Sequence, residues 1–297
     1  MVIYLDQCAA SYLATANKPS ARWDDLREIL QRGFSEGRLC CPMPVETFHE
    51  SSSPVFGQEN RIELELFFNA VGGGAMFSDF YSILRDEAIG IVRPNQPIMA
   101  YSSRAPKGWS ARDDAAAVCY KRHKEHRNQM ADRNSAHKSP LGAEQLSVWQ
   151  IFDKTAEERS RIFLTDLERL RGGADGGFIY EWLTSWVTQN QLTSDEIELL
   201  IENVRNGIWR FTGVNFVDLL LGSRWEHDRL RRQRPNYDAN DEIDRWRMSV
   251  ALGYADICIT DAYAAGLCDR SKITKFTSAA VYSVKDIEKL ITKIGSV

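Results

Sequence analysis

The sequence lacks several features that would assign it to whole classes of protein. No apolar run approaches the ~20 residues that a membrane-spanning helix needs. The N-terminus has neither the basic start nor the long apolar stretch of a signal peptide. The 6 cysteines include no Cys-x-x-Cys pair, and the spacing of His123, His126 and His137 matches no standard zinc pattern. We therefore expect a cytoplasmic protein with reduced thiols and no membrane anchor.

The chain also lacks an overall excess of positive charge, an internal repeat and a low-complexity tract. Its formal net charge is -4, so binding to nucleic acid would have to come from local basic patches. A hydrophobic content of 43% and a charged content of 26% are typical of a folded soluble protein. With 297 residues, the chain can bury a full core in one large domain or two ordinary ones.

Both ends of the chain alternate between strand-like and helix-like segments, which is typical of a parallel α/β fold. The strand candidates are residues 2–5, 38–42 and 257–260, and residues 272–277 and 279–282 supply one or two further short strands. The helix candidates are residues 21–34, a helix that starts at or just after Pro44, residues 240–253, and a final amphipathic helix capped by Ser283-Val-Lys-Asp286.

Between residues 51 and 235, helical periods dominate and few stretches resemble strands. The helix candidates are Ile62–Val71, Asp79–Ala88, Asp113–Asp132, Ala143–Arg171, Phe178–Gln189, Ser194–Asn206 and Phe211–Leu221. Thr193 to Glu196 fits a capping box. The simplest architecture is one α/β domain, residues 1–55 plus 236–297, interrupted by a helical insertion at 56–235. A separate helical domain in series is the alternative, and the short N-terminal segment makes it less attractive.

Acidic residues lie at what we predict to be one edge of the parallel sheet. Asp6 follows the first strand, Asp261 follows the strand at 257–260, and Asp244 begins the helix before that strand. Glu50 lies in the opening turns of the helix after the second strand candidate. Since the carboxyl ends of parallel strands share one edge, where open α/β sheets bind ligands, we expect these carboxylates to meet.

Carboxylates that share a small cleft raise one another's pKa unless positive charge compensates them. Mg²⁺ or Mn²⁺ prefers such hard oxygen ligands. One or two of these ions can activate a water and stabilise the attacking and leaving oxygens of a phosphodiester. The pattern therefore predicts a metal site of Asp6, Glu50, Asp244 and Asp261.

Each acid also has a structural interpretation. A single Asp after a strand is more often a turn residue or a helix cap than a ligand, and Asp241 can act as a dipole partner of its helix. Glu46 lies one turn before Glu50 on the same helix face, so one of the two can simply face solvent. Asp256 precedes the strand that Asp261 follows, and the ~13 Å length of that strand places it at the opposite edge. We exclude Asp256 from the predicted site.

Three segments resemble the motif blocks of PIN-like nucleases. They read YLDQCAASYLA at residues 4–14, PMPVETFHE at 42–50 and DEIDRWRMSVALGYADICITD at 241–261. The resemblance covers the two ends of the chain and leaves the middle unassigned. It implies a three-layer α/β/α fold with a central parallel sheet, a Mg²⁺ or Mn²⁺ site, and hydrolysis of RNA and sometimes DNA. In this resemblance, Asp6, Glu50, Asp244 and Asp261 correspond to the acids of that site, and Asp241 is a further candidate metal ligand that would replace or assist Asp244.

Two basic tracts supply candidate contacts to a phosphate backbone. The first comprises Lys121, Arg122, Lys124 and Arg127, and the second comprises Arg229, Arg231, Arg232 and Arg234. A solvated helix face paired with nearby acids is the other interpretation of both tracts. The second tract leads directly into the acidic helix, which favours a function for it.

These features predict a PIN-like α/β protein, interrupted by a large all-helical insertion, that acts as a Mg²⁺- or Mn²⁺-dependent phosphodiesterase on nucleic acid. RNA is favoured over DNA as the substrate. The insertion would shape substrate access or bind a protein partner or a second copy of the chain. Two alternatives stay open: a non-catalytic PIN-like scaffold that binds nucleic acid or protein, and a helical regulator whose α/β half is only structural.

Overall fold

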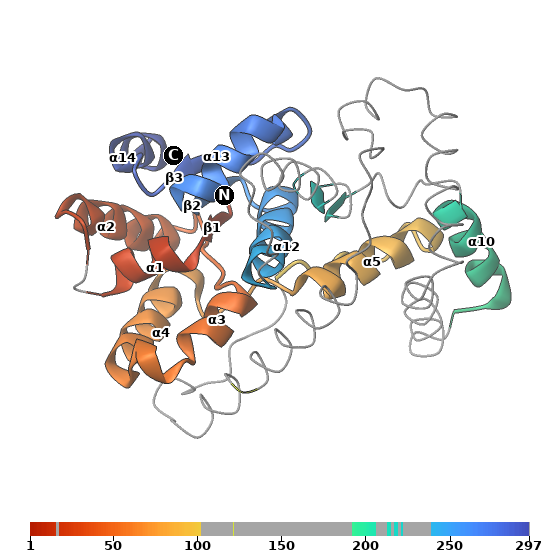
Figure 1. The fold of residues 1–297 in the computed structure, drawn as a ribbon, viewed down its shortest axis with the longest axis horizontal. Helices are drawn as coiled ribbons and strands as arrows, with labels where there is room; N and C mark the ends of the chain where they lie inside the picture. The colour runs from red at the N-terminus through yellow and green to blue at the C-terminus, as the bar shows by residue number, and fades with distance from the viewer. Residues whose placement is uncertain are drawn as a thin grey trace.

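The computed structural model describes residues 1–15, 18–101, 121, 192–205, 213, 214, 217, 218, 221 and 239–296 (Figure 1). Its described part contains a parallel sheet of β1 (Ile3–Leu5), β2 (Ile257–Thr260) and β3 (Ala280–Ser283), with β2 in the middle. In the register, Leu5 lies opposite Ile259, which lies opposite Tyr282. The prediction of a parallel α/β sheet is confirmed, and its strands come from the two ends of the chain.

The described helices precede and follow these strands. On the N-terminal side they are α1 (Gln7–Ala14), α2 (Arg22–Ser35), α3 (Val45–Ser51), the 3-10 helix η1 (Pro54–Phe56), α4 (Gln58–Gly72) and α5 (Phe80–Val92). Further along the chain they are α10 (Ser194–Arg205), α12 (Ala239–Tyr254), α13 (Ala262–Ser271), η3 (Ile273–Lys275) and α14 (Ile287–Gly295). None of them is long and apolar enough to cross a membrane, as far as the described residues extend.

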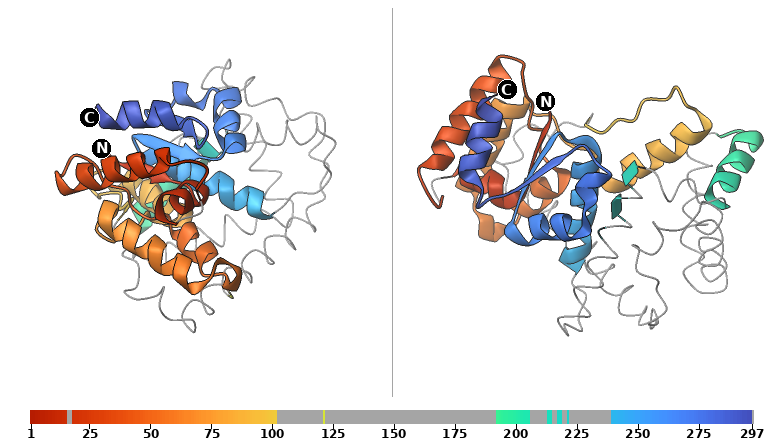
Figure 2. Two further views of the ribbon diagram at one scale, coloured as in Figure 1. Left: turned by 90° about the vertical axis from the view of Figure 1, so that its left-hand side faces the viewer. Right: turned by 90° about the horizontal axis from the view of Figure 1, so that it is seen from above.

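Helices cover both faces of the sheet, because successive strand residues point to opposite sides. Tyr4 and Cys258 belong to a hydrophobic cluster that includes buried residues of α5, α12 and α13. Their neighbours Ile3, Leu5 and Ile259 belong to a second cluster that includes buried residues of α1, α2, α4 and α14. The described part therefore has three layers, with the sheet between two groups of helices (Figure 2).

The hydrophobic period predicted most of these helices correctly. The candidates at 21–34, after Pro44, at 62–71, at 79–88 and at 194–206 correspond to α2, α3, α4, α5 and α10. The capping box before α10 is also confirmed: Thr193 Oγ1 accepts from the Glu196 amide at 3.3 Å, and Glu196 Oε2 accepts from the Thr193 amide at 2.8 Å. The candidates at 113–132, 143–171, 178–189 and 211–221 fall largely outside the described residues.

The strand prediction at 38–42 is wrong, and of the segments 272–277 and 279–282 only the second forms a strand. Residues 38–42 form a single bridge, between Cys40 and Val2, because the next amide, that of Cys41, donates to the Val71 carbonyl at the end of α4 instead. The candidate at 272–277 contains η3, which follows Lys272 in a left-handed conformation with φ 52°. The short helices α1 and α13 were not predicted. Each follows an aspartate that caps it, and neither carries a long apolar stripe.

The hydrophobic core around the sheet extends beyond the first 55 residues of the chain. Buried residues of α4, including Leu64, Phe67 and Phe68, share a cluster with Leu5 of β1 and Leu30 of α2. The apolar stripe predicted for residues 240–253 is buried on the other face, where α12 contributes Met248, Ala251 and Leu252. The division of the chain at residues 55 and 236 stays a prediction.

Glu87 on α5 is a partly buried carboxylate outside the strand edge. Its Oε1 accepts a hydrogen bond from the Tyr254 hydroxyl at 2.6 Å, and both its oxygens lie within 3.1 Å of the Val214 amide nitrogen. Burial raises the pKa of Glu87 above its ordinary value of 4.5, and the two hydrogen bonds only partly oppose this effect. The folded state therefore binds the Glu87 proton more tightly than the unfolded state.

We expect Glu87→Gln to reduce the pH dependence of stability. Because the folded-state pKa is raised, the contribution of Glu87 to folding is greatest below pH 4.5 and is lost as the pH rises through the folded pKa. Between pH 4.5 and neutral pH, the wild-type free energy of unfolding should therefore fall relative to that of the variant. The expected change is on the order of 1 kcal/mol or less, since the group is partly exposed. Urea denaturation across this range measures it, and a constant difference would contradict the assignment.

Candidate functional site

Asp6 and Asp261 each follow a strand and cap the helix that comes next. Asp6 Oδ1 accepts a hydrogen bond from the Gln7 amide at 2.8 Å, at the start of α1. Asp261 Oδ1 accepts from the amides of Tyr263 at 2.5 Å and Ala264 at 2.9 Å, at the start of α13. Because β1 and β2 are adjacent and parallel, these two aspartates lie at the same edge of the sheet. Each is therefore a helix cap and also an edge residue.

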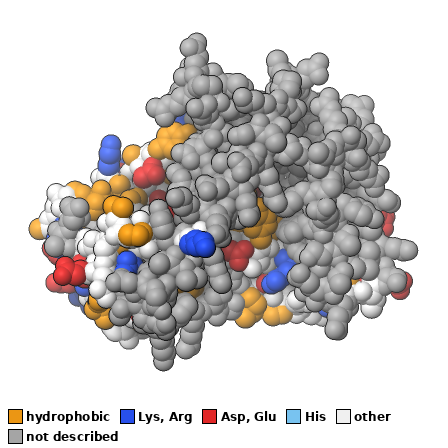
Figure 3. Space-filling model, turned by 60° about the horizontal axis from the view of Figure 1, so that its bottom comes forward, with side chains coloured by type: hydrophobic (Ala, Val, Ile, Leu, Met, Phe, Trp, Pro, Cys, Tyr) orange, Lys and Arg blue, Asp and Glu red, His pale blue; other side chains and the backbone are white. Residues whose placement is uncertain are grey.

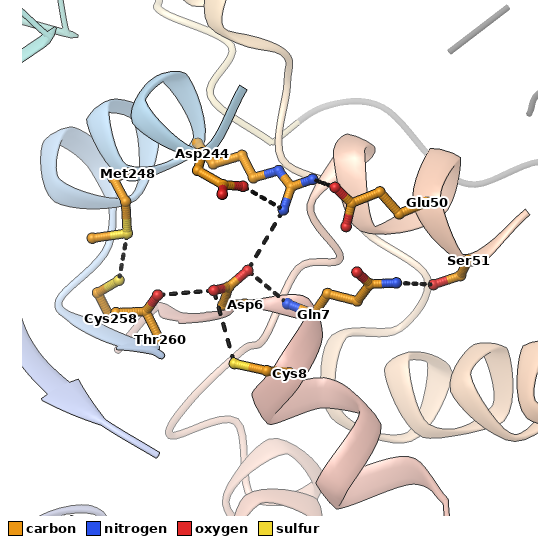
Figure 4. Close-up of polar contacts among 10 residues, drawn as sticks. Asp6, Gln7, Cys8, Glu50, Ser51, Asp244, Met248, Cys258 and Thr260 are labelled. Carbon is orange, nitrogen blue, oxygen red and sulfur yellow. Dashed lines mark hydrogen bonds and ion pairs between the residues drawn. The ribbon is translucent and has the colours of Figure 1, made fainter. Parts of the chain in front are cut away.

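The other two predicted acids reach the same place from different helices. Asp244 lies in the second turn of α12, and Glu50 lies near the end of α3. Both contact Arg247, which lies one turn after Asp244 on α12 (Figure 4). Arg247 Nη1 is 3.3 Å from Asp244 Oδ1 and 3.7 Å from Asp6 Oδ1, and Nη2 pairs with Glu50 Oε1. The structure thus brings Asp6, Glu50 and Asp244 together around one guanidinium.

Arg247 is the most deeply buried member of this cluster. Its side chain is 4% exposed, compared with 17% for Asp6, 24% for Glu50 and 49% for Asp244. Burial alone would lower the pKa of Arg247, but the charges of Glu50, Tyr4, Asp244 and Asp6 raise it above its ordinary value. The guanidinium therefore stays charged among the acids.

The carboxyl group of Asp244 has a pKa raised to about 7. The main cause is loss of hydration where protein atoms surround the carboxylate, although about half of the side chain remains exposed. Arg247 lowers this pKa, whereas the charges of Asp6, Glu50 and Asp261 raise it. Asp261 therefore belongs to the same electrostatic cluster, and a single arginine does not compensate the four acids.

Neighbouring side chains hold Asp6 in place. Asp6 Oδ2 accepts a hydrogen bond from Thr260 Oγ1 at 2.8 Å and from the Cys8 thiol at 3.9 Å (Figure 4). Burial, followed by the charges of Asp6 and Asp261, raises the pKa of Cys8, so this thiol stays protonated. Gln7 Nε2 donates to Ser51 Oγ at 3.4 Å, which connects the start of α1 to the end of α3 beside Glu50.

Three further acids lie close to the predicted site residues in the sequence. Asp256 lies at the opposite end of β2, where its Oδ2 accepts from the Val2 amide at 2.7 Å, so its predicted placement at the opposite edge of the sheet is confirmed. Asp241 lies on α12 one turn before Asp244, and Glu46 lies on α3 one turn before Glu50. The side chains of Asp241 and Glu46 are outside the described part of the structure.

Most of the two basic tracts lies outside the described residues. This holds for Arg122, Lys124 and Arg127 of the first tract and for Arg229, Arg231, Arg232 and Arg234 of the second. Lys121 is described and is exposed. On the face shown in Figure 3, the described surface carries hydrophobic, acidic and basic side chains that are interspersed.

Arg247 was not predicted from the sequence. The signal was its spacing of three residues from Asp244, which places the two side chains on the same face of a helix. A carboxylate at a partly buried position of this helix, such as that of Asp244, requires a positive partner, and the sequence supplies Arg247 within a single turn. The spacing alone does not reveal that the same guanidinium also reaches Asp6 and Glu50, which come from distant segments.

The carboxylate oxygens of the cluster suit a hard divalent cation, but the positions of these side chains in the structure do not form a complete metal-binding site. Among the described residues, no group of three or more His, Cys, Asp or Glu side chains is placed to hold a metal ion. Arg247 lies between three of the acids. The carboxylates carry more negative charge than this arginine supplies, and carboxylate oxygens are the ligands that Mg²⁺ and Mn²⁺ prefer.

Comparison of the chain with protein-family models, with curated proteins and with solved structures found no match. The resemblance to PIN-like nucleases therefore rests on the three motif blocks, and the acid cluster has to be judged on its geometry.

Proposed function

We propose that the chain is a Mg²⁺- or Mn²⁺-dependent nuclease with Asp6, Glu50, Asp244 and Asp261 at its site. One observation carries this proposal: acids from four separate segments converge at the carboxyl edge of a parallel sheet, where Asp6, Glu50 and Asp244 pair with Arg247 and the charge of Asp261 acts on Asp244. Structural ion pairing alone would need about one positive charge for each acid, whereas the described residues of this cluster comprise four acids and one arginine. An excess of carboxylates at a sheet edge favours a metal site over a purely structural network.

The roles of the individual residues follow from their contacts. Asp6 and Asp261 are fixed by the backbone amides that they cap, so their orientation does not depend on a bound ligand. Thr260 further restricts Asp6. Glu50 and Asp244 both form ion pairs with Arg247, which offsets part of the negative charge of the cluster. A bound Mg²⁺ or Mn²⁺ would activate a water and offset the charge on the phosphate.

The choice of nucleic acid as substrate belongs to the same proposal. Its supports are the PIN-like motif blocks and the second basic tract, which immediately precedes α12 in the sequence. The PIN-like three-layer fold and the preference for RNA over DNA are proposed from the same motif blocks, and the helical insertion at 56–235 is proposed from the helical periods of that segment. Phosphate contacts from Arg231, Arg232 and Arg234 would offset the net charge of -4.

We expect the purified chain to cleave end-labelled single-stranded RNA when Mn²⁺ or Mg²⁺ is present and to lose this activity in EDTA. Cleavage requires a cation because the carboxylates themselves repel the phosphate. Single-stranded DNA of the same sequence, tested in parallel, measures the substrate preference. Asp256→Asn is the matched control, because it removes a carboxylate at the opposite edge of the sheet. Protein that cleaves neither substrate with either ion would contradict the proposal.

A non-catalytic scaffold is the second candidate, and the position of Arg247 favours it. A guanidinium already pairs with Glu50 and contacts Asp244 and Asp6, so the apo-protein is partly compensated without a metal. A scaffold of this kind would bind nucleic acid without cleaving it, and Mn²⁺ would leave its melting temperature unchanged. The nuclease should instead melt at a higher temperature in Mn²⁺, since a ligand that binds only the folded state stabilises it.

A further inference from the structure

Arg247 divides the acid cluster into two parts. Among the described residues, its ion pairs involve Glu50, Asp244 and Asp6 and leave out Asp261. Asp261 follows β2, the neighbour of β1 in the sheet, and uses Oδ1 to cap α13. Its charge raises the pKa of Asp244. Asp6 lies between the two parts, because its Oδ1 is 3.7 Å from Arg247 while its Oδ2 faces Thr260 and Cys8 (Figure 4).

The guanidinium is held by carboxylates rather than by a framework of neutral hydrogen bonds. Within the described residues, its hydrogen bond goes to Glu50 and its ion pairs go to the three acids, while its buried Nε has no hydrogen-bond partner. An arginine that only joined two helices would use its whole donor set on fixed acceptors. Arg247 instead lies where a cation shared by Glu50, Asp244 and Asp6 would lie.

The charges limit what else the cluster can bind. When all four acids are ionised, they and Arg247 sum to -4 + 1 = -3. One divalent cation would bring this sum to -1, and two would bring it to +1 with three cationic groups in one cleft. Like charges at such short range, away from bulk water, repel strongly. The side chain of Arg247 is only 4% exposed, so protein atoms surround it where it lies among the acids.

We infer that Arg247 takes the place of a second metal ion, so that the site binds one divalent cation through Asp6 and Asp261. The inference rests on the proposed function only in taking a divalent cation as the ligand. It makes Arg247 a positioning residue that sets the stoichiometry and strength of metal binding, and it assigns Glu50 and Asp244 to the arginine rather than to the metal.

The direct test counts Mn²⁺ ions on the full chain by isothermal titration calorimetry, with free Mn²⁺ followed by electron paramagnetic resonance. Wild-type protein should bind one Mn²⁺. Arg247→Met removes the charge but keeps an apolar side chain, and it should bind two ions, the first at least tenfold more tightly than wild type does. Arg247→Lys keeps the charge and should bind one. Asp6→Asn should lose specific binding, which separates site-bound ions from adventitious ones.

A second pair of variants tests the inference without altering the buried arginine. Asp261→Asn should weaken Mn²⁺ binding at least tenfold, because this acid is assigned to the metal. Glu50→Gln should change the affinity less than threefold, because the charge of Glu50 is compensated by Arg247. Circular dichroism and thermal melting confirm that both variants fold.

The outcomes separate this inference from the proposed nuclease. Wild-type protein that binds two Mn²⁺ ions, Arg247→Met protein that binds one with unchanged affinity, or equal losses in Glu50→Gln and Asp261→Asn would overturn the role of Arg247. Each of these results is compatible with metal-dependent cleavage. Wild-type protein that binds no Mn²⁺ would overturn both, and the RNA cleavage assay would then also be negative.

Discussion

Replacing Asp6 or Asp261 with asparagine is expected to lower the rate of Mn²⁺-dependent RNA cleavage by at least about 100-fold. Each substitution removes one negative charge from the cluster and replaces a carboxylate oxygen with an amide nitrogen, which does not bind a cation. The rate is measured under single-turnover conditions with end-labelled single-stranded RNA, so that slow product release does not hide the effect.

Asparagine is the informative replacement because both aspartates also cap helices. Its amide oxygen can accept the bonds that Gln7 donates to Asp6 and that Tyr263 and Ala264 donate to Asp261. Asn and Asp are about equally good N-caps, so the structural role is kept while the charge is lost. Removing one of several like charges also relieves their repulsion. We therefore expect the melting temperatures of both variants to stay near that of the wild type or to rise.

The Asp256→Asn variant provides the comparison for this experiment. Asp256 also borders β2 and accepts a backbone hydrogen bond, but it does so at the other end of the strand. Its rate should equal that of the wild type. If Asp6→Asn and Asp261→Asn cleave as fast as Asp256→Asn does, the acid cluster is not the catalytic site.

Gly72→Ala is expected to cost about 3 kcal/mol of stability, the largest effect that we anticipate for a change outside the acid cluster. Gly72 ends α4, and a Cβ at this position would lie 2.3 Å from the carbonyl oxygen of Cys41 and 2.9 Å from its carbonyl carbon. The obstacle is backbone, and the Cys41 amide is bonded to the neighbouring Val71 carbonyl at 2.8 Å. The chain at Cys41 cannot withdraw without breaking that bond.

Gly90→Ala is the matched control for this substitution. Gly90 lies within α5, and a Cβ there would meet no heavy atom of the described residues within 4 Å. Alanine favours the helix over glycine by up to about 1 kcal/mol, so this variant should be as stable as the wild type or more stable. Guanidinium denaturation of both variants gives the comparison. Equal stabilities would show that α4 can move away from Cys41.

Several elements of the fold followed from local sequence patterns. The β-branched run at 257–260 is β2, and the 3.6-residue period located α2, α4, α5, α10 and α12. Local patterns failed where neighbours far along the chain decide the conformation. Cys41 lies in a segment with the composition of a strand, yet its amide donates a hydrogen bond to the Val71 carbonyl near the end of α4. The helices α1 and α13 are short, and each begins at an aspartate that we assigned to the metal site from its position after a strand.

One part of the candidate site could be predicted from the sequence, and the other part depends on the tertiary structure. The placement of Asp6 and Asp261 at one edge was determined by the sequence, because parallel strands end at the same edge whatever surrounds them. The sequence also indicated that the carboxylate of Asp244, which lies on α12, needs a positive partner. Which cation meets it, and which other acids share that cation, depends on how α12 packs beside α3 and β1. Only the tertiary structure decided that Arg247 joins Asp244, Glu50 and Asp6, because side chains from distant segments pair through folding and not through their spacing in the chain.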